Sequence, residues 1–277
     1  MASPPAPLGS LELIHRAIEA DVAYTISRLQ VLERLPKNPI GVAYRRVDGR
    51  IAALMARYIP SRSFNRVVGL RAGDEAHVAP LVAWYREHEV TARFEMVPGD
   101  YDAALGRELA RNGFHHSGFH PALACRLNDP IAPPPPADIE HVTTAAAMED
   151  FLDAYVAGWG FPEKDHPQFK ANVRPWLNQP GWSLYLARVD GRPAATATLF
   201  VHGDTAYCAD ATTDPAFRRR GLHSALLHRR IMDARNAGVD LVTSGAEFLS
   251  ASYRNMERIG MRLMFMRALG SPLAESA

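Results

Sequence analysis

The chain has 277 residues, of which 47% are hydrophobic, so it is long enough to bury one large core or two smaller ones, and two domains are expected. Lysine and arginine number 31, and aspartate and glutamate 30, which gives a formal net charge of +1. This balance argues against a general nucleic-acid binder or membrane-surface binder, because both depend on an excess of positive charge.

The N-terminal segment and the cysteines bear on where the protein works. Residues 1–10 contain three prolines and lack the apolar segment of a signal peptide, so we expect a flexible tail. No stretch approaches the ~20 apolar residues that a membrane-spanning helix needs. Cys125 and Cys208 are isolated in apolar runs, and we expect both to be reduced and structural. These features predict a cytoplasmic protein with no membrane partner.

The first half, residues 11–128, has the pattern of an α/β domain. The run Arg46-Val47-Asp48-Gly49-Arg50 lies between apolar segments and predicts a hairpin with Asp-Gly at its turn. The following pattern predicts a strand at 66–70, a helix at 75–88, a strand at 93–97, a helix at 101–112 and one more strand.

A proline-rich segment at residues 129–137 follows this half. It includes four consecutive prolines, Pro133 to Pro136, which favour extended polyproline II structure. We therefore expect a semi-rigid linker between two domains.

The second half, residues 138–270, is predicted to be a second α/β domain, followed by a tail at 271–277. Gly238 is a suitable residue to end a helix that begins at Leu222. The predicted elements are helices at 145–158 and 167–178, a strand at 205–213, a helix from 222 to about 237, a strand at 240–246, a helix at 252–259 and a strand at 263–266.

The two halves resemble one another. Arg-Val-Asp-Gly-Arg at residues 46–50 recurs at residues 188–192, and Asn112-Gly113-Phe114 corresponds to Ile259-Gly260-Met261. Between these points both halves have the same predicted order of strands and helices. We interpret this as a tandem duplication; the alternative is an unrelated α/β domain whose order coincides by chance.

A basic turn lies between the strand at 205–213 and the helix that follows. It contains Arg218-Arg219-Arg220-Gly221, and the helix begins at Leu222. Such a turn presents unpaired backbone N–H groups at a helix N-terminus, where the helix dipole adds partial positive charge. The ligand expected there is a phosphate or pyrophosphate.

This turn resembles the acyl-CoA pyrophosphate loop of the GCN5-related N-acetyltransferases. That loop reads Arg or Gln, two residues, Gly, one residue and Gly or Ala, and the match here is Arg218 and Gly221, with His223 in place of the last small residue. The run from Ser252 to Met261 also resembles the family's last helix, Ser-x-Arg-Asn-x-Glu-Arg-x-Gly-Phe. The resemblance implies an α/β (mixed α+β) chain of two tandem folds, each a mixed, mostly antiparallel twisted sheet flanked by helices.

The resemblance also implies acetyl-CoA as co-substrate and a set of residues that bind it. An imidazolium at His223 would attract phosphate. The histidines, such as His115, His116 and His120, lack a ligand spacing with Cys or carboxylates, so no metal site is expected. The expected CoA-binding residues are Ala211, Thr212, Thr213, Arg218, Arg219, Arg220, Gly221, Leu222, His223, Ser224, Ser252 and Asn255.

The first half differs at the corresponding turn. Residues 69–75 lack the Arg-x-x-Gly spacing and put Asp74 and Glu75 at the start of a helix. Carboxylates there satisfy the helix N-terminus and would repel a pyrophosphate. We therefore expect the first half to be a degenerate copy that does not bind CoA.

Acetyl transfer to an amine requires a base for the ammonium and is assisted by an acid for the thiolate. Asp210 and Glu247 are the base candidates, and a water relay is the alternative. Strand alternation would put Asp210 on the same face as Cys208 and Thr212. The family often has an acidic Tyr four residues before the glycine of the last helix, where this chain has Met256; Tyr253 is the remaining acid candidate, or else a packing aromatic.

The sequence does not identify the acceptor. By resemblance, its site is built by the helices at 145–158 and 167–178, and the aromatic residues near them are Trp159, Phe161, Trp176 and Trp182.

The function predicted from the sequence is an N-acetyltransferase that acts on a small-molecule or peptide amine. No nucleic acid partner is expected, and a homodimer is left open. One alternative is a catalytically weak CoA-binding regulatory or scaffold protein, and another is an aminoacyl transferase with paired domains.

Overall fold

The computed structural model describes residues 7–59, 61 and 63–273. It divides the chain into two compact units: unit 1 comprises residues 1–10 and 123–263, and unit 2 comprises residues 11–122 and 264–277. The boundary therefore falls within a strand, β5 (Phe114–Arg126), and not in the proline-rich segment where a linker was expected. Most of the last strand, β11 (Arg262–Pro272), counts with unit 2, although the sequence analysis assigns residues up to 270 to the second domain.

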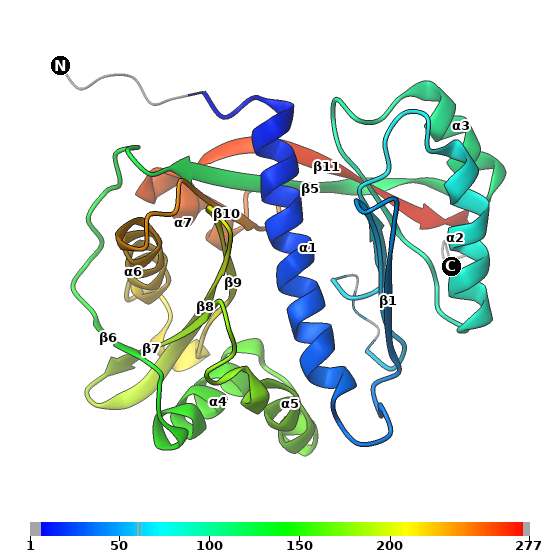
Figure 1. The fold of residues 1–277 in the computed structure, drawn as a ribbon. Coiled ribbons are helices and arrows are strands. Elements are labelled where there is room, and N and C mark those ends of the chain that lie inside the picture. The colour runs from blue at the N-terminus through cyan, green and yellow to red at the C-terminus, as the bar shows by residue number, and fades with distance from the viewer. Residues whose placement is uncertain (1–6, 60, 62, 274–277) are drawn as a thin grey trace. The chain divides into compact units, whose positions relative to one another are not determined.

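Unit 2 is a sheet with helices on both faces (Figure 1). Helix α1 covers one face, and α2 and α3 cover the other, where a core forms around Met55, Tyr85 and Phe94. The strand order is β1-β2-β3-β4-β11, with β5 beside β11, and the β3–β4 pair is parallel. The elements are α1 (Leu11–Glu33), β1 (Val42–Val47), β2 (Ile51–Ala56), β3 (Arg66–Val68), α2 (Glu75–Glu87), β4 (Phe94–Met96) and α3 (Ala103–Arg111), with the parts of β5 and β11 that belong to this unit.

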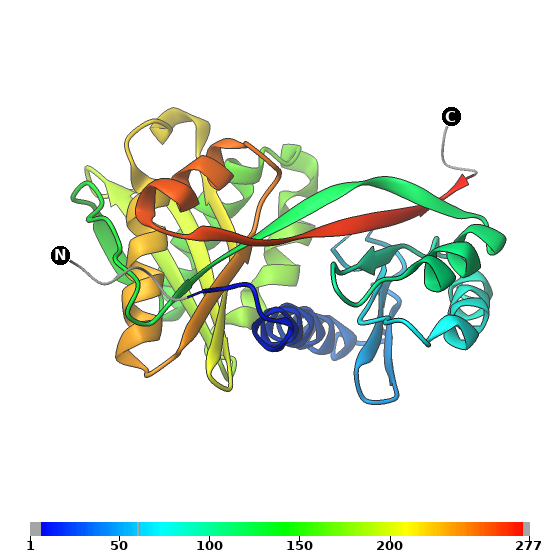
Figure 2. The ribbon, with the colours of Figure 1, turned by 90° about the horizontal axis from the view of Figure 1, so that it is seen from above.

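Unit 1 is also a mixed, mostly antiparallel sheet between two layers of helices. Figure 2 shows α6 and α7 on one face of its sheet and α4 and α5 on the other. The strand order is β6-β7-β8-β9-β10, with β5 beside β10. The elements are β6 (Asp138–His141), α4 (Ala145–Trp159), η1 (Glu163–Asp165), α5 (His166–Val173), η2 (Arg174–Trp176), β7 (Trp182–Val189), β8 (Arg192–His202), β9 (Thr205–Thr213), η3 (Pro215–Phe217), α6 (Leu222–Asn236), β10 (Leu241–Gly245), α7 (Ala251–Ile259) and the start of β11.

The order of elements repeats between the units. Each has an antiparallel hairpin with Asp-Gly at its turn, where Asp48 and Gly49 have φ of 49° and 73°, and Asp190 and Gly191 have φ of 51° and 75°. Two successive positive φ angles match the twist of the flanking strands, which is why Asp-Gly is favoured at such turns. In both units a third strand, a helix, a parallel strand and a second helix follow.

The core of unit 1 lies between its sheet and the helices α6 and α7. Leu226, Leu227 and Ile231 of α6 are completely buried against alternate residues of the strands, including Tyr185 and Ala187. Burying each such aliphatic side chain stabilises the fold by about 1.5–3 kcal/mol. This packing fixes the position of α6, and hence of its N-terminus.

The proline-rich segment packs on unit 1 and is not a free spacer. The backbone N–H of Ala132 donates to the carbonyl of Ile259 at 2.9 Å, at the end of α7. The carbonyl oxygen of Pro130 lies only 2.5 Å from where a Cβ on Gly260 would stand. Polyproline-like backbone has no internal hydrogen bonds, so its polar groups remain available to the helix end beside it.

Three further expectations differ from the structure. The helix expected at 167–178 ends at Val173, because Pro175 lacks an N–H and restricts the residue before it. The tail expected at 271–277 is wrong at its first two residues, since β11 extends to Pro272; residues 274–277 lie outside the described residues. Of the tail expected at 1–10, residues 1–6 lie outside the described residues, whereas Leu8 is buried.

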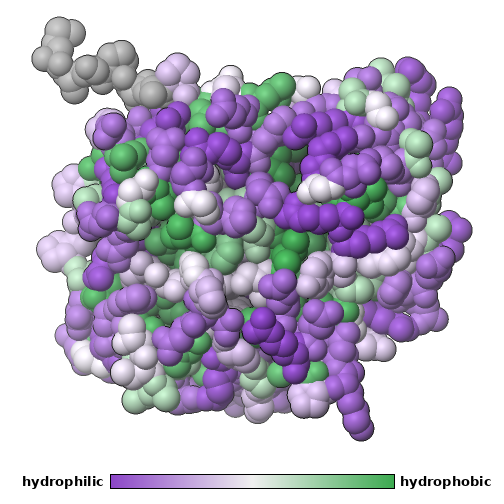
Figure 3. All heavy atoms as spheres, viewed as in Figure 1, coloured by the Kyte–Doolittle hydropathy of each residue, from purple (hydrophilic) through white to green (hydrophobic). Residues whose placement is uncertain are grey.

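No helix within residues 7–59, 61 and 63–273 is both long and apolar enough to cross a membrane. The face drawn in Figure 3 is covered mainly by hydrophilic side chains, with smaller apolar areas between them.

Candidate functional site

The sheet of unit 1 opens between two parallel strands. Strands β9 and β10 pair only from Thr205 to Tyr207 against Leu241 to Thr243. One residue further on, the side chain of Ser244 donates to the carbonyl of Cys208 at 2.8 Å, where a backbone group would continue a regular ladder. The strands therefore separate toward their carboxyl ends, which leaves backbone groups free to bind an extended ligand.

A β-bulge in β9 enlarges this opening. Thr212 pairs with Thr196 and Ala209 with Thr198, so two residues of β9 face one of β8, and Asp210 has φ of 45°. A bulge bends its strand and redirects side chains. The strict alternation expected from Cys208 through Asp210 to Thr212 is therefore wrong, because the extra residue interrupts it.

A first cavity of about 630 Å³ lies beside this opening, and we call it the loop cavity. Every residue that the sequence analysis assigns to CoA binding lines it, from β9, the basic turn, the first turn of α6 and α7. Three further lining residues were missed: Phe217, Ala251 and Arg258. Arg258 could have been found, since it follows Asn255 by three residues and so shares its helix face. The binding role of the whole set stays a prediction.

The N-terminus of α6 is suited to hold an anion. Gly221 precedes the helix with φ of 77°, and no side chain caps the first turn, whereas Thr144 and Ser250 cap α4 and α7. The N–H groups of the first turn therefore have no intrahelical partner and add to the positive end of the helix dipole. The exposed side chains of Arg218, Arg219 and Arg220 add charge around the same cavity.

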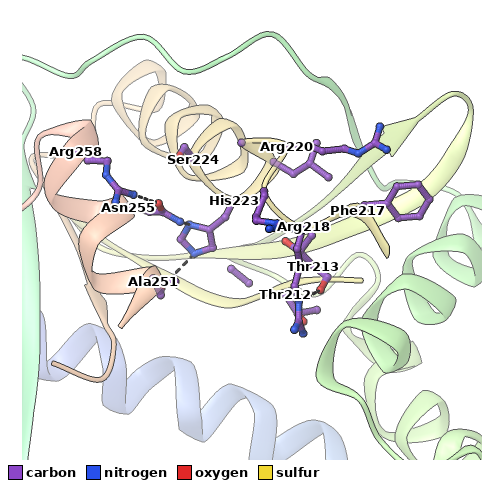
Figure 4. A pocket seen from close by; sticks show the side chains of 15 residues that line it. Thr212, Thr213, Phe217, Arg218, Arg220, His223, Ser224, Ala251, Asn255 and Arg258 are labelled. Atoms are coloured by element: carbon purple, nitrogen blue, oxygen red, sulfur yellow. Dashed lines mark hydrogen bonds between the residues drawn. The ribbon is translucent and has the colours of Figure 1, made fainter. Parts of the chain in front are cut away.

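His223 is turned toward α7 and is not an imidazolium at neutral pH. Figure 4 shows its ring between α6 and α7, on the side of Asn255. The ring nitrogens lie within hydrogen-bonding distance of Ser252 Oγ (3.2 Å) and Asn255 Nδ2 (3.3 Å). Burial, together with the nearby guanidinium of Arg230, lowers the pKa of His223 to about 4. The expected attraction between a charged His223 and phosphate is thus wrong, because desolvation favours the neutral ring.

A second cavity of about 390 Å³ adjoins the first, and we call it the strand cavity. The two share Ala211, His223 and Ser252. Both predicted base candidates, Asp210 and Glu247, line the strand cavity. The other lining residues are Trp159, Cys208, Ala209, Arg230, Ser244, Gly245, Ala246, Ser250 and Met256.

The two carboxylates differ in their surroundings. Asp210 is partly buried at the bulge and accepts a long hydrogen bond of 3.4 Å from Thr198 Oγ1, whereas Glu247 is exposed just beyond β10. A carboxylate in either place could accept a proton from an ammonium group that enters the cavity.

Tyr253 does not reach the strand cavity, although Met256 does. The Tyr253 ring is buried in the core of unit 1 and packs edge-on against Phe248, with ring centroids 5.4 Å apart. Burial and the neighbouring Glu257 raise its pKa. The structure therefore gives Tyr253 the role of a packing aromatic and does not bring it together with the other catalytic candidates.

Only one of the four aromatic residues suggested for an acceptor pocket lines the strand cavity. Trp159, at the end of α4, is 48% exposed and lines it, whereas Trp176 and Trp182 are buried and pack on one another. Phe161 stacks between Trp159 and Phe169.

The corresponding turn of unit 2 is filled by a side chain of its own. The carboxylate of Asp74 accepts the backbone N–H of Arg71 at 2.7 Å and pairs with both Nη atoms of Arg50 at 2.5 and 2.6 Å. The hydrogen bond from Arg50 is the main reason that the pKa of Asp74 is lowered. Asp74 does not cap α2, contrary to expectation, because its oxygens are taken by these partners.

Among the described residues, no group of three or more His, Cys, Asp or Glu side chains is arranged to hold a metal ion.

A sheet that opens between parallel strands, with an uncapped helix N-terminus beside the opening, defines a fold of the acetyltransferase type. Residues 135–254 match the family model described as Acetyltransferase (GNAT) domain. No curated protein sequence matches the chain.

Solved structures show the same fold over most of the chain. A GCN5-related N-acetyltransferase from Kribbella flavida has a TM-score of 0.62 at 19% identity, covering 91% of this chain and 95% of its own. One from Sphaerobacter thermophilus has a TM-score of 0.55 at 17% identity, covering 95% and 91%. A tandem GNAT protein from the clavulanic acid biosynthesis pathway has a TM-score of 0.59 at 14% identity, covering 99% and 98%.

Proposed function

We propose that this chain is an N-acetyltransferase that transfers the acetyl group of acetyl-CoA to the amino group of a small molecule or peptide. The observation that carries the proposal is the meeting of two cavities in unit 1. One is lined by the uncapped N-terminus of α6 and four arginines, and the other by two carboxylates. The pyrophosphate of CoA requires the first, and a reacting ammonium requires the second.

The residues of the loop cavity fit a CoA pyrophosphate. A phosphate at a helix N-terminus is bound by backbone N–H groups, which needs close approach and therefore little side-chain bulk at Gly221. Exposed arginines nearby suit the remaining phosphate groups, because a guanidinium offers paired donors to phosphate oxygens. The separated ends of β9 and β10 would hold the pantetheine arm through backbone hydrogen bonds.

Unit 2 is proposed to be a degenerate copy without a CoA site. The support is the turn filled by Asp74: its carboxylate occupies the N–H donor and the arginine that a phosphate would need. A negative charge held there also repels a pyrophosphate. One acetyl-CoA per chain is therefore expected.

A thiol-release assay with acetyl-CoA and a panel of amines tests the proposed reaction. Release of one CoA thiol for each acetylated amine, above the rate without acceptor, is the expected result. Binding of acetyl-CoA without transfer to any amine would instead favour a CoA-binding regulatory protein. That second candidate rests on Met256, which puts a thioether in the strand cavity where the family often has a phenol.

A further inference from the structure

Arg230 is a buried cation that has no ionic partner among the residues that the structure describes. It lies on α6, is 1% exposed and lines the strand cavity. Its Nε donates to the carbonyl of Leu226 at 3.1 Å, and its Nη1 donates to the carbonyls of Thr198 at 3.0 Å and Ala209 at 3.2 Å. Among the described residues, Nη2 has no hydrogen-bond partner and no carboxylate lies within ion-pair distance of the guanidinium.

The other buried arginines among the described residues are paired. Arg66 and Arg267 in unit 2 each contact two buried carboxylates, those of Asp21 and Glu95. An unpaired charge in the interior is costly, and a protein normally supplies a counter-ion. Carbonyl dipoles compensate the charge of Arg230 only in part. The donors on its Nη2 therefore remain available to an anion that forms in the strand cavity.

The other groups that line this cavity are not cations. Asp210 and Glu247 are carboxylates, His223 is neutral because its pKa is lowered to about 4, and burial raises the pKa of the Cys208 thiol. In the described chain, Arg230 is thus the one positive group of the strand cavity. It also anchors the bulge through Ala209, so its position relative to the opening of the sheet is fixed.

The proposed reaction generates an anion there. The amine nitrogen attacks the thioester carbonyl carbon, so that a C–N bond forms and the C–S bond breaks. The electron pair of the C–S bond leaves on sulfur, and the proton of the amine passes to a carboxylate or to water. With Met256 in the cavity and Tyr253 in the core, no Tyr is among the described residues that line either cavity, so the sulfur is expected to depart as a thiolate and to take its proton from water afterwards.

We propose that Arg230 stabilises this departing CoA thiolate by its charge, in place of a phenol, which the described lining of the strand cavity lacks. This inference rests on the proposed function. A fixed cation beside a sulfur that becomes negative favours the transition state for C–S cleavage over the uncharged thioester.

The test is an ultraviolet titration of CoA bound to the full chain, which follows the absorbance of the thiolate with pH. S-methyl-CoA, which has no thiol, supplies the baseline. Cys125 and Cys208 do not interfere near neutral pH, because burial raises the pKa of both thiols, that of Cys125 to about 12. We expect the thiol of bound CoA to ionise about 1–3 pKa units lower than that of free CoA, the effect of an adjacent opposite charge.

Two variants assign the shift. Arg230→Gln keeps an amide donor without the charge, and it should lose the shift while calorimetry still detects CoA binding. Arg229→Gln is the matched control on the same helix, because Arg229 pairs with Asp233 away from the cavity and its loss should leave the shift intact. If Arg230→Gln does not fold, Arg230→Lys keeps the charge and should keep most of the shift.

The outcomes separate this inference from the proposed function. A bound thiol with the pKa of free CoA overturns the role of Arg230 alone, as does a shift that persists in Arg230→Gln or disappears in folded Arg230→Lys. A wild-type chain that binds no CoA in calorimetry overturns both.

Discussion

Tyr253 and Met256 lie three residues apart on α7, yet only Met256 reaches the strand cavity. The core of unit 1 takes the aromatic ring, and the flexible thioether is left beside the reacting atoms. The consequence is that the phenol of Tyr253 serves packing, and that the side chain in the cavity, Met256, has no proton to donate to the sulfur.

Replacement of Tyr253 by Phe is expected to leave turnover within about threefold of the wild type, because the hydroxyl is not in the cavity; a general acid is typically worth about 10²–10⁴ in rate. Steady-state kinetics with acetyl-CoA and an accepted amine measures the effect. A loss of tenfold or more in turnover, with unchanged affinity for acetyl-CoA, would show that the phenol reaches the sulfur after all.

His223 gives the folded chain a pH dependence in weak acid. Its pKa is lowered to about 4 in the folded state, whereas an unfolded chain has the ordinary value of about 6.5. As pH falls from about 6.5 to 4, the unfolded state binds the proton first, so the free energy of unfolding decreases through this window. Denaturant unfolding at pH 7.5 and at pH 5 measures the effect: the free energy of unfolding should decrease less between these two pH values in His223→Gln than in the wild type. Equal losses would mean that the ring of His223 is already exposed to solvent.

At the scale of elements, the junction of the basic turn and α6 depends on a glycine. Gly221 has φ of 77°, and a Cβ there would stand 2.8 Å from Cγ of Pro135. Gly238, just beyond the other end of the same helix, has φ of 76° with nothing within 4 Å of its added Cβ. The two glycines share a left-handed backbone conformation, which would strain any residue with a Cβ, and they differ in crowding and in distance from the cavity.

Gly221→Ala is therefore expected to weaken acetyl-CoA binding at least tenfold, while Gly238→Ala changes it by less than twofold. Each variant should lose about 1 kcal/mol of stability from the left-handed conformation, and Gly221→Ala should lose more than Gly238→Ala because its Cβ crowds Pro135. Calorimetric titration of the two variants gives the comparison. Equal affinities of Gly221→Ala and Gly238→Ala for acetyl-CoA would contradict a role of the basic turn in binding.

In the second half of the chain, the sequence predicts helices and strands well where several local signals agree. Apolar spacing and Gly238 place α6 within a residue or two, and the strand at 205–213 is confirmed as β9. The bulge at Asp210 leaves no sequence signal, because a non-glycine residue holds its positive φ. Arg230 was missed for a related reason: sequence alone reads an arginine on a helix as exposed, and only the packing of α6 buries it.

In the first half and the segment after it, local sequence patterns miss a helix and wrongly predict a linker. No helix is predicted over residues 11–33, although the structure has α1 there, because Asp21 and Thr25 occupy buried positions that a sequence pattern assigns to solvent. The proline-rich segment suggests a linker because local composition does not reveal that its backbone pairs with the end of α7.

Across the molecule, the last strand is joined to unit 2 by its pairing with β4 and by a charge cluster. Arg267 of β11 contacts Asp21 of α1 and Glu95 of β4, and Arg66 of β3 contacts the same two carboxylates. Four elements of unit 2 are tied by these pairs. Residues far apart in the sequence, Asp21 and Arg267, are thus joined by an ion pair that local sequence patterns do not predict.

Removal of one member of this cluster is expected to be costly. Arg267→Met leaves two carboxylates with one arginine and should destabilise the chain by about 3–5 kcal/mol. Arg254→Met, at an exposed position on α7, is the control and should change stability by less than about 0.5 kcal/mol. Denaturant unfolding at neutral pH measures both, and equal effects would contradict the role of the cluster.

The same cluster should make the chain sensitive to strong acid. Burial would raise the pKa of Asp21, but Arg66 and Arg267 outweigh it, and the pKa is lowered overall. A lowered folded pKa contributes stability that is present above the unfolded value of about 3.9 and is lost as pH falls through the folded value. Between pH 5 and pH 2, the free energy of unfolding should therefore fall more steeply with decreasing pH in the wild type than in Asp21→Asn. Equal slopes of the unfolding free energy against pH would contradict this.

Calorimetric titration of the full chain with acetyl-CoA measures whether the proposed cofactor binds and at how many sites. We predict one binding site per chain, in unit 1, and its loss in Gly221→Asp, which places a carboxylate at the N-terminus of α6. No binding, two equivalent sites per chain, or unchanged affinity in Gly221→Asp would contradict it.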